Sequence, residues 1–230
     1  MKISTHNIAR KLLAAAALAV GIGAIAPQNA EACGGAWYPE VQIDYRIQGI
    51  ARAEKQLEQG KHADAAASVI RMIPHIRNYK AKSSDRIINR ALRVLAVATV
   101  RGDGKLDIAT QIPYELRGQW LAQKDGDETA NLEWAVVAMR SVNSWKSDDP
   151  AVQTELGEAL AKVDAHESEA RELLGDLADK DLLGSAEGYA ALAELRAANG
   201  DEDGRSAALK RCEAMAKTPG LCQAPVFGQS

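Results

Sequence analysis

Apolar residues recur every three or four positions along most of this chain, which is the spacing of one face of an α-helix. In the segment 150–163, for example, Val152, Leu156, Ala159 and Leu160 fall on one such face. No segment alternates apolar and polar residues with a high content of β-branched or aromatic side chains, so no strand is expected. The sequence therefore predicts an all-α protein. The expected helices span 43–59, 62–78, 84–101, 114–123, 128–145, 150–163, 167–179, 185–199 and 203–217.

Glycine and capping residues mark where these helices begin and end. Gly60 and Gly200 follow periodic segments and predict tight turns, and connections this short force neighbouring helices to run antiparallel. Asp149 and Pro150 form a typical helix start, because the carboxylate accepts a hydrogen bond from a backbone N–H and proline needs no N–H partner at the first position. Ser185 is the expected cap of the helix that begins after it.

Residues 1–32 have the features of a removable export signal. Cationic residues stand near the start, the run 12–26 is apolar, and the small-x-small pattern at 30–32 is one that a signal peptidase accepts. We expect cleavage at the end of this segment, which leaves Cys33 as the first residue of a periplasmic or secreted chain. The alternative is a membrane anchor, but that needs about 20 apolar residues, and this run stops before Pro27.

Three regions are expected after the signal. They are an irregular segment over 33–42, a helical domain over 43–217 and an irregular tail over 218–230. The whole chain has a formal net charge of −3, and the chain without the signal is more acidic, because the signal carries mainly cationic residues. This charge argues against a nucleic-acid partner, which would need a basic surface. No segment after the signal is long and apolar enough to predict a transmembrane helix.

Export to an oxidising compartment favours a disulfide between Cys212 and Cys222. These cysteines stand ten positions apart, and Pro219 and Gly220 between them let the chain turn back. The alternative is two independent thiols. Cys33 is then left over, and it is either free, paired with another chain or the site of a lipid link.

The same residue types return at the same place in two successive helix pairs. Leu156-Gly157 and Leu192-Ala193 lie 36 positions apart, close to a repeat period of about 34 residues. The last pair carries further matching positions at Tyr189, Leu192, Ala193, Gly200, Leu209 and Cys212. A third match runs through Ala53, Gly60, His62 and Ala65. On these residues the chain resembles a tetratricopeptide-repeat (TPR) protein over 150–217, and more loosely over 45–78.

The resemblance implies antiparallel helix pairs stacked as a right-handed solenoid, with the first helix of each pair facing a partner protein or peptide. On this basis the candidate partner-binding residues are Arg46, Glu54, Glu158 and Arg196. The sequence departs from the family pattern at Gln56, Asp164, Arg196 and Arg205, and 79–149 fits only as amphipathic helices. The alternative architecture is an irregular helical bundle.

Metal and cofactor motifs are missing or incomplete in the sequence. Residues 199–204 begin like a calcium-binding loop, but Lys210 stands where a bidentate glutamate would complete the coordination. His62, His75 and His166 have no metal-ligand spacing. The sequence contains no nucleophile elbow, phosphate-binding glycine loop, closely spaced cysteine pair or haem site. We therefore expect no metal, no cofactor and no catalytic residue.

These observations favour a non-enzymatic protein- or peptide-binding scaffold of the cell envelope. Trp134, within the expected helix 128–145, and Trp145, at its end, are added as candidate contact residues, since tryptophan often anchors protein interfaces. One alternative is a structural subunit of an envelope assembly, joined through Cys33 or the tryptophans. Another is an enzyme with an unrecognised active site, for which His62 and His166 are the residues to test.

Overall fold

The computed structural model of the chain describes residues 44–82, 84–117 and 127–223, and all regular structure in them is helical. The elements are α1 (Tyr45–Glu58), α2 (His62–Met72), η1 (Ile76–Asn78), α3 (Arg86–Arg101), α4 (Tyr114–Arg117), α5 (Glu128–Asn143), α6 (Pro150–Ala161), η2 (Asp164–His166), α7 (Glu167–Asp179), α8 (Ala186–Ala198) and α9 (Glu202–Met215). The all-α prediction is confirmed. The predicted signal over 1–32 and the irregular segment over 33–42 lie outside the described residues.

The predicted helix starts form as the capping rules require. The Asp149 carboxylate accepts hydrogen bonds from the backbone N–H groups of Ala151 and Val152, at 3.0 and 3.4 Å, and Pro150 is the first residue of α6. The Ser185 hydroxyl oxygen accepts from the N–H of Gly188 at 2.9 Å at the start of α8. Both caps satisfy backbone donors that have no partner inside the helix.

The turns after α1 and α8 share one geometry. Gly60 and Gly200 both have a positive φ, of +72° and +76°, a conformation that glycine adopts without steric cost. In each turn the N–H after the glycine donates to the carbonyl five residues earlier, at 2.9 Å in both cases, which is the Schellman arrangement of a helix end. These two turns were predicted to be equivalent on the repeat pattern. At Asp164, where that pattern lacks its glycine, the chain forms the short helix η2 instead.

The second helix is shorter than expected. The predicted helix over 62–78 ends at Met72 in α2, and its last residues form the separate turn η1. Pro74 explains the difference, because proline has no N–H for the helix and forces the residue before it into an extended backbone. Ile73 accordingly has φ −138° and ψ 81°. The long helices from α3 onward begin and end within two residues of their predicted limits.

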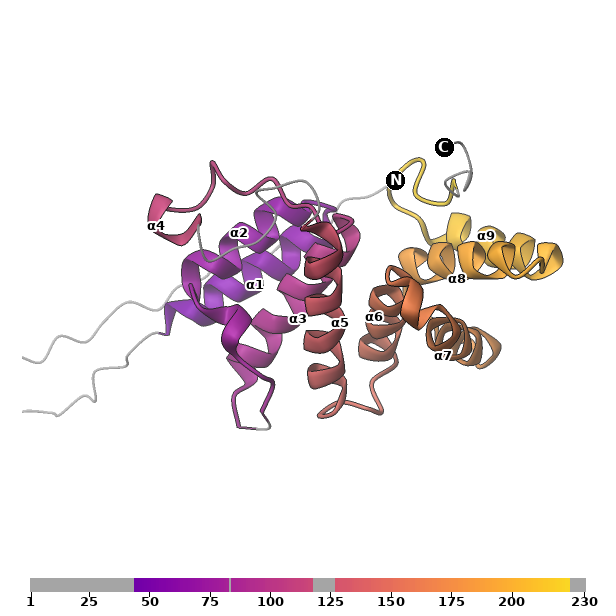
Figure 1. Cartoon of the computed structure of the whole chain (residues 1–230), viewed down its shortest axis with the longest axis horizontal. Helices are drawn as coiled ribbons and strands as arrows, with labels where there is room; N and C mark the ends of the chain where they lie inside the picture. The colour runs from indigo at the N-terminus through magenta and orange to yellow at the C-terminus, as the bar shows by residue number, and fades with distance from the viewer. Residues whose placement is uncertain (1–43, 83, 118–126, 224–230) are drawn as a thin grey trace, which may run out of the picture. The chain divides into compact units, whose positions relative to one another are not determined.

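Among the described residues, each long helix packs against the next long helix along the chain, and α3 packs directly against α5 (Figure 1). Helices two elements apart also contact each other, as α1 does with α3 and α6 with α8, and α3 reaches α6 as well. This pattern fits stacked helix pairs and is also compatible with an irregular bundle, so the solenoid and its handedness stay predictions. Among the described residues, none of the helices combines the length and apolar character needed to cross a bilayer.

Small side chains let the helices approach closely. Gly157 on α6 faces Leu174 on α7, and a Cβ added at the glycine would lie 2.4 Å from a methyl carbon of that leucine. Leu174 is fully buried and therefore has no room to move aside. Alanine fills much of the remaining core, including Ala159 and Ala193, both fully buried. The glycine and alanine positions of the repeat pattern thus lie at helix contacts.

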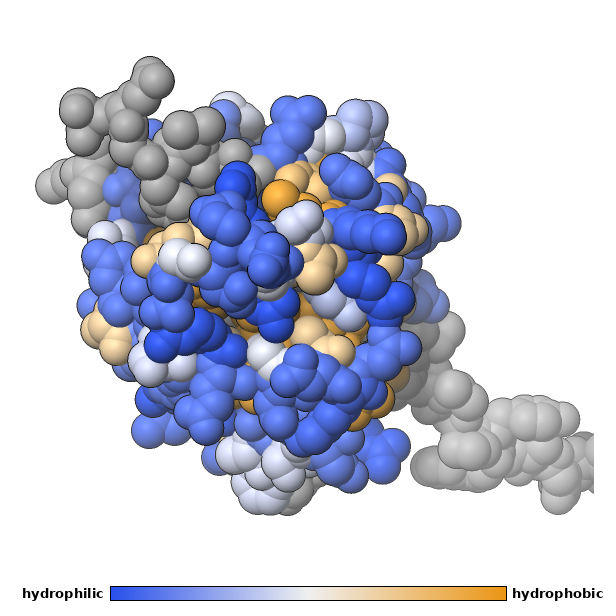
Figure 2. All heavy atoms as spheres, turned by 90° about the vertical axis from the view of Figure 1, so that its right-hand side faces the viewer, coloured by the Kyte–Doolittle hydropathy of each residue, from blue (hydrophilic) through white to orange (hydrophobic). Residues whose placement is uncertain are grey.

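The last helix is polar on its outer side. Only Ala208 and Cys212 of α9 are buried, and hydrophilic side chains prevail on the face seen in Figure 2. After α9, residues 216–223 have no regular secondary structure, and the rest of the predicted tail, 224–230, lies outside the described residues. The predicted disulfide forms between Cys212 and Cys222, whose Cα atoms are 5.8 Å apart.

Candidate functional site

A partly open cavity of about 280 Å³ is the best candidate site in the described residues. Its wall is built from the turn between α1 and α2, the C-terminal end of α3, the helices α6 and α8, and the tail after α9. Helices α6 and α8 contribute five of the thirteen lining residues. Along α8, Glu187, Ala190, Ala191 and Glu194 are spaced by three or four positions and therefore share one face.

Arg101, the last residue of α3, organises the buried side of this cavity. Its guanidinium donates two hydrogen bonds to the Glu158 carboxylate, at 3.0 and 3.1 Å, and lies 3.2 Å from a carboxylate oxygen of Glu187. Glu158 is only 3% exposed and also accepts a 2.6 Å hydrogen bond from the Ser185 hydroxyl. Burial lowers the pKa of Arg101. The negative charges of Glu158 and Glu187 together have the larger effect and hold this pKa above its usual value.

Carboxylates outnumber cations in the cavity wall. Four carboxyl groups, those of Asp103, Glu158, Glu187 and Glu194, face the cationic side chains of Arg101 and Lys162. Both cations are already paired, since the Lys162 ammonium lies 2.7 Å from a carboxylate oxygen of Asp103. The remaining carboxylate, that of Glu194, makes no hydrogen bond or ion pair among the described residues, and burial raises its pKa. The wall therefore carries surplus negative charge.

His62, the first residue of α2, contributes a neutral ring to the same wall. Burial lowers its pKa, and the nearby positive charge of Arg101 lowers it further. The imidazole is therefore uncharged at neutral pH. Neither ring nitrogen has a hydrogen-bond partner within the described part of the chain.

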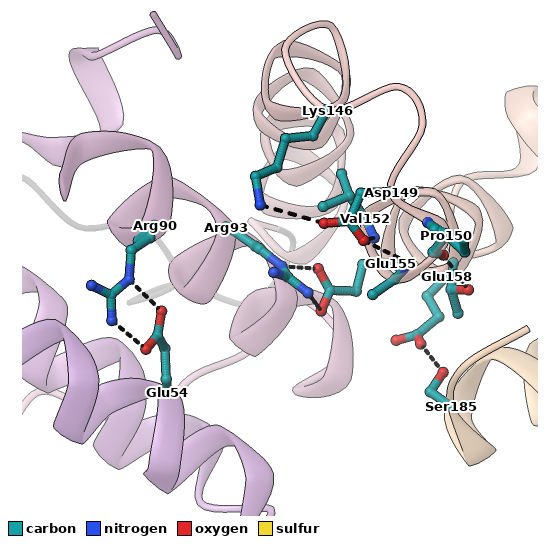
Figure 3. Close-up of polar contacts among 12 residues, drawn as sticks. Glu54, Arg90, Arg93, Lys146, Asp149, Pro150, Val152, Glu155, Glu158 and Ser185 are labelled. Carbon is teal, nitrogen blue, oxygen red and sulfur yellow. Dashed lines mark hydrogen bonds and ion pairs between the residues drawn. The ribbon is translucent and has the colours of Figure 1, made fainter. Parts of the chain in front are cut away.

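Two further arginines of α3, Arg90 and Arg93, are each paired with one glutamate (Figure 3). Arg90 donates to the Glu54 carboxylate at 2.8 and 2.6 Å, which joins α3 to α1. Arg93 donates to the Glu155 carboxylate at 2.5 and 2.8 Å, which joins α3 to α6. These bidentate pairs fix the position of α3 between its neighbours.

The predicted partner-binding charges lie in different surroundings. Glu158 lies in the cavity wall, whereas Glu54 is held by an arginine of α3. Arg46 pairs with Asp44, the cap of α1, at 2.8 Å. Arg196 donates to the backbone carbonyl of Gly204 at 3.0 Å, across the turn between α8 and α9. The structure therefore brings only one of the four residues to the cavity, and their role in partner binding stays a prediction.

The two candidate tryptophans attach the segment after α2 to α5. The indole N–H of Trp134 donates to the carbonyl of Arg77 at 3.3 Å, and the ring also lies 5.3 Å from the Arg77 guanidinium carbon. The indole N–H of Trp145 donates to the carbonyl of Ala81 at 2.9 Å. Trp145 is nonetheless 51% exposed. It therefore keeps surface for a contact as well as its structural bond.

Sequence reasoning missed most of the cavity wall. Arg101, Lys162, Glu187 and Glu194 were not named as candidate site residues, and His62 entered only as a repeat position and as a residue to test for the enzyme alternative. One signal was available in the sequence. Two glutamates and two alanines fall on a single face of α8, and charged residues around a small apolar centre are a pattern that could have indicated a binding surface. The ion pairs, however, join residues 57 or more positions apart, which periodicity does not reveal.

No group of three His, Cys, Asp or Glu side chains in the described residues is arranged to hold a metal ion. The chain was also compared with known proteins. No protein-family model, curated protein or solved structure matches it.

Proposed function

We propose that this chain is a non-catalytic, exported binding protein that holds a protein or peptide partner around the cavity, with one basic side chain of the partner inside it. The observation that carries the proposal is the surplus of carboxylates in a wall whose own cations are already paired. A lysine or arginine would neutralise that surplus, which is the usual basis of electrostatic complementarity at interfaces.

The size and apolar part of the cavity suit one long basic side chain. Small-molecule sites have volumes of about 300 to 1,000 Å³, so a cavity of about 280 Å³ is small for a cofactor. Val100, Ala190, Ala191 and Leu221 supply an apolar surface on which the methylene stem of a lysine can pack. The charged end would then lie among the carboxylates.

Glu194 is the residue most available to such a ligand. Its raised pKa means that the folded state binds the Glu194 proton more tightly than the unfolded state does. The stability that this difference contributes at low pH is therefore lost as the pH rises through the folded pKa. At neutral pH the ionised carboxylate costs the fold free energy, and a cationic partner would offset that cost.

Export of the chain is supported by the signal-like features of 1–32 and by the disulfide between Cys212 and Cys222, since disulfides persist in oxidising compartments. The enzyme alternative has one observation in its favour, the neutral imidazole of His62, because an unprotonated histidine can act as a general base. Cys33, through which an envelope subunit would be joined, lies outside the described residues, and the exposed Trp145 is the observation that favours this alternative.

The test is a binding titration with an acetylated and amidated pentapeptide, alanine at all positions except a central lysine, followed by NMR. We expect Glu194→Gln to weaken binding about three- to tenfold and to leave the free energy of unfolding at pH 7 unchanged or higher. The matched control is Glu172→Gln, at an exposed glutamate of α7 outside the cavity, which should bind as the wild type does. Equal affinities for the wild type and Glu194→Gln would refute the proposal. Turnover of ester or peptide substrates that disappears in His62→Ala would favour the enzyme instead.

A further inference from the structure

The tail after α9 forms one wall of the cavity. Thr218 and Leu221, both in the irregular segment 216–223, line it together with the face of α8 that carries the glutamates. Leu221 is half-buried and packs against the hydrophobic core. A binding site in this cavity therefore includes residues that no helix positions.

Few interactions hold this tail in place. Its backbone hydrogen bonds are local, from Leu221 to Thr218 at 3.5 Å and from Gln223 to Gly220 at 3.1 Å. Within the described residues, no hydrogen bond or ion pair joins 217–223 to α6 or α8. Besides the packing of its apolar side chains, the disulfide is what attaches the tail to the helical body.

The disulfide is well placed for this task. Cys212 lies on α9 and is fully buried, so its position is fixed by the core. Cys222 follows directly after Leu221, so the bond holds the lining leucine one residue from a rigid helix. Cys222 is only half-buried, which leaves its sulfur the more accessible of the two.

We propose that 216–223 is a wall of the ligand site that the Cys212–Cys222 bond holds in place, so that cleavage of this bond by a dithiol reductant opens the cavity and weakens ligand binding. This inference rests on the proposed function of the cavity. One thiolate of the reductant attacks the Cys222 sulfur, forms a mixed disulfide and releases Cys212 as a thiol. The second thiol of the reductant then releases Cys222, so the two cysteines gain two electrons and two protons and the reductant becomes a disulfide.

The helices are also joined to one another by contacts that do not involve the tail. The turn between α8 and α9 is closed by its own backbone hydrogen bonds, and α9 packs along α8. Loss of the bond should therefore free the tail without unfolding the helices. In the oxidised protein the short closed loop limits the conformations of the tail, and this limit disappears on reduction.

The experiment compares the full chain with its Cys212→Ala/Cys222→Ala variant, using the same lysine pentapeptide. Alanine at both positions avoids a new pairing of a remaining thiol with Cys33. We expect the variant to bind at least tenfold more weakly while its far-UV circular dichroism stays that of a helical protein. Trypsin should also cut after Lys217, an exposed residue of the tail, about tenfold faster than in the oxidised wild type.

A second variant covers the case in which the cysteine pair does not fold. Leu221→Ala keeps the bond and removes the apolar part of the tail wall, and we expect a three- to tenfold loss of affinity. Gln223→Ala, at an exposed tail residue that does not line the cavity, is its control and should bind as the wild type does.

The outcomes separate the two proposals. If the oxidised wild type does not bind the lysine peptide, the proposed function of the cavity is wrong and the inference about its wall falls with it. If the wild type binds and both Leu221→Ala and the cysteine variant bind equally well, the tail is not a wall of the site, and the proposed function stands.

Discussion

The two ends of α3 use the same residue types for different purposes. Toward its N-terminal end, Arg90 faces Glu54 as a single carboxylate partner, and these side chains are 41% and 37% exposed. At the C-terminal end, Arg101 faces both Glu158 and Glu187, and the first of these pairs is 14% and 4% exposed. The second cluster borders the cavity described above and has a carboxylate left over.

The difference teaches how to separate a structural ion pair from a binding site. A bidentate pair with matched charges fixes two helices and has nothing left to offer a ligand. A cluster with more carboxylates than cations, beside a hollow, holds charge that the fold itself does not neutralise. The number of surplus charges, more than the presence of ion pairs, identifies the candidate site.

The largest expected effect compares the two arginines directly. Arg101→Met removes the cation that satisfies the buried Glu158 carboxylate, which should lower the free energy of unfolding by about 3 to 5 kcal/mol. Arg90→Met breaks a pair of exposed side chains and should cost less than about 1 kcal/mol. Urea denaturation of both variants measures the difference, and equal losses would show that the two ends of α3 are alike.

A smaller effect tests whether packing, apart from charge, fixes α6 beside the cavity. Gly157 directly precedes Glu158 and contacts Leu174, so Gly157→Ala should cost about 1 to 3 kcal/mol through overpacking. Gly175 on α7 has nothing within 4 Å of an added Cβ. Gly175→Ala should therefore stabilise the protein by up to about 1 kcal/mol, because alanine is the better helix former. Thermal unfolding measures the melting temperature of both variants. Shifts of the melting temperature in opposite directions would support this contact, whereas shifts in the same direction would contradict it.

The smallest effect concerns how the free energy of unfolding depends on pH through His62 in the cavity wall. The folded pKa of His62 lies below its unfolded value of about 6.5, so the unfolded state binds the proton first as the pH falls. The free energy of unfolding should therefore decrease from about pH 6.5 down to the folded pKa, by less than about 1.4 kcal/mol for each pKa unit of difference.

His62→Asn should remove this decrease, and His75→Asn, at an exposed histidine outside the cavity, should preserve it. Urea denaturation between pH 5 and 7 gives the comparison. An unchanged slope in His62→Asn would mean that its ring is not shielded by the cavity wall.

The helices and their caps could be predicted from the sequence because local physics determines them. The Asp149 and Ser185 caps and the Gly60 and Gly200 turns need only a few neighbouring residues. The end of α2 is also determined locally, by Pro74, and the prediction that this helix continues to residue 78 gave that proline too little weight. The tail disulfide could be anticipated for the same reason, since its cysteines are separated by only ten positions.

The candidate site could not be predicted in the same way. Its wall combines residues from α2, α3, α6, α8 and the tail, and only tertiary packing brings them together. The repeat resemblance suggested which helices would face a partner, and the first helices of the last two pairs do line the cavity. Which of their charges remain unmatched depends on Arg101 and Lys162, whose partners lie far away in the sequence.

The most direct test of the central claim is a double-mutant cycle between Glu194 and the lysine of the pentapeptide. Wild type and Glu194→Gln are each titrated with the lysine peptide and with its norleucine counterpart, which keeps the stem and lacks the charge. The proposal predicts a favourable coupling free energy of about 1 kcal/mol between the carboxylate and the ammonium group. A coupling of zero, with wild type and variant preferring lysine equally, would contradict a basic side chain in this cavity.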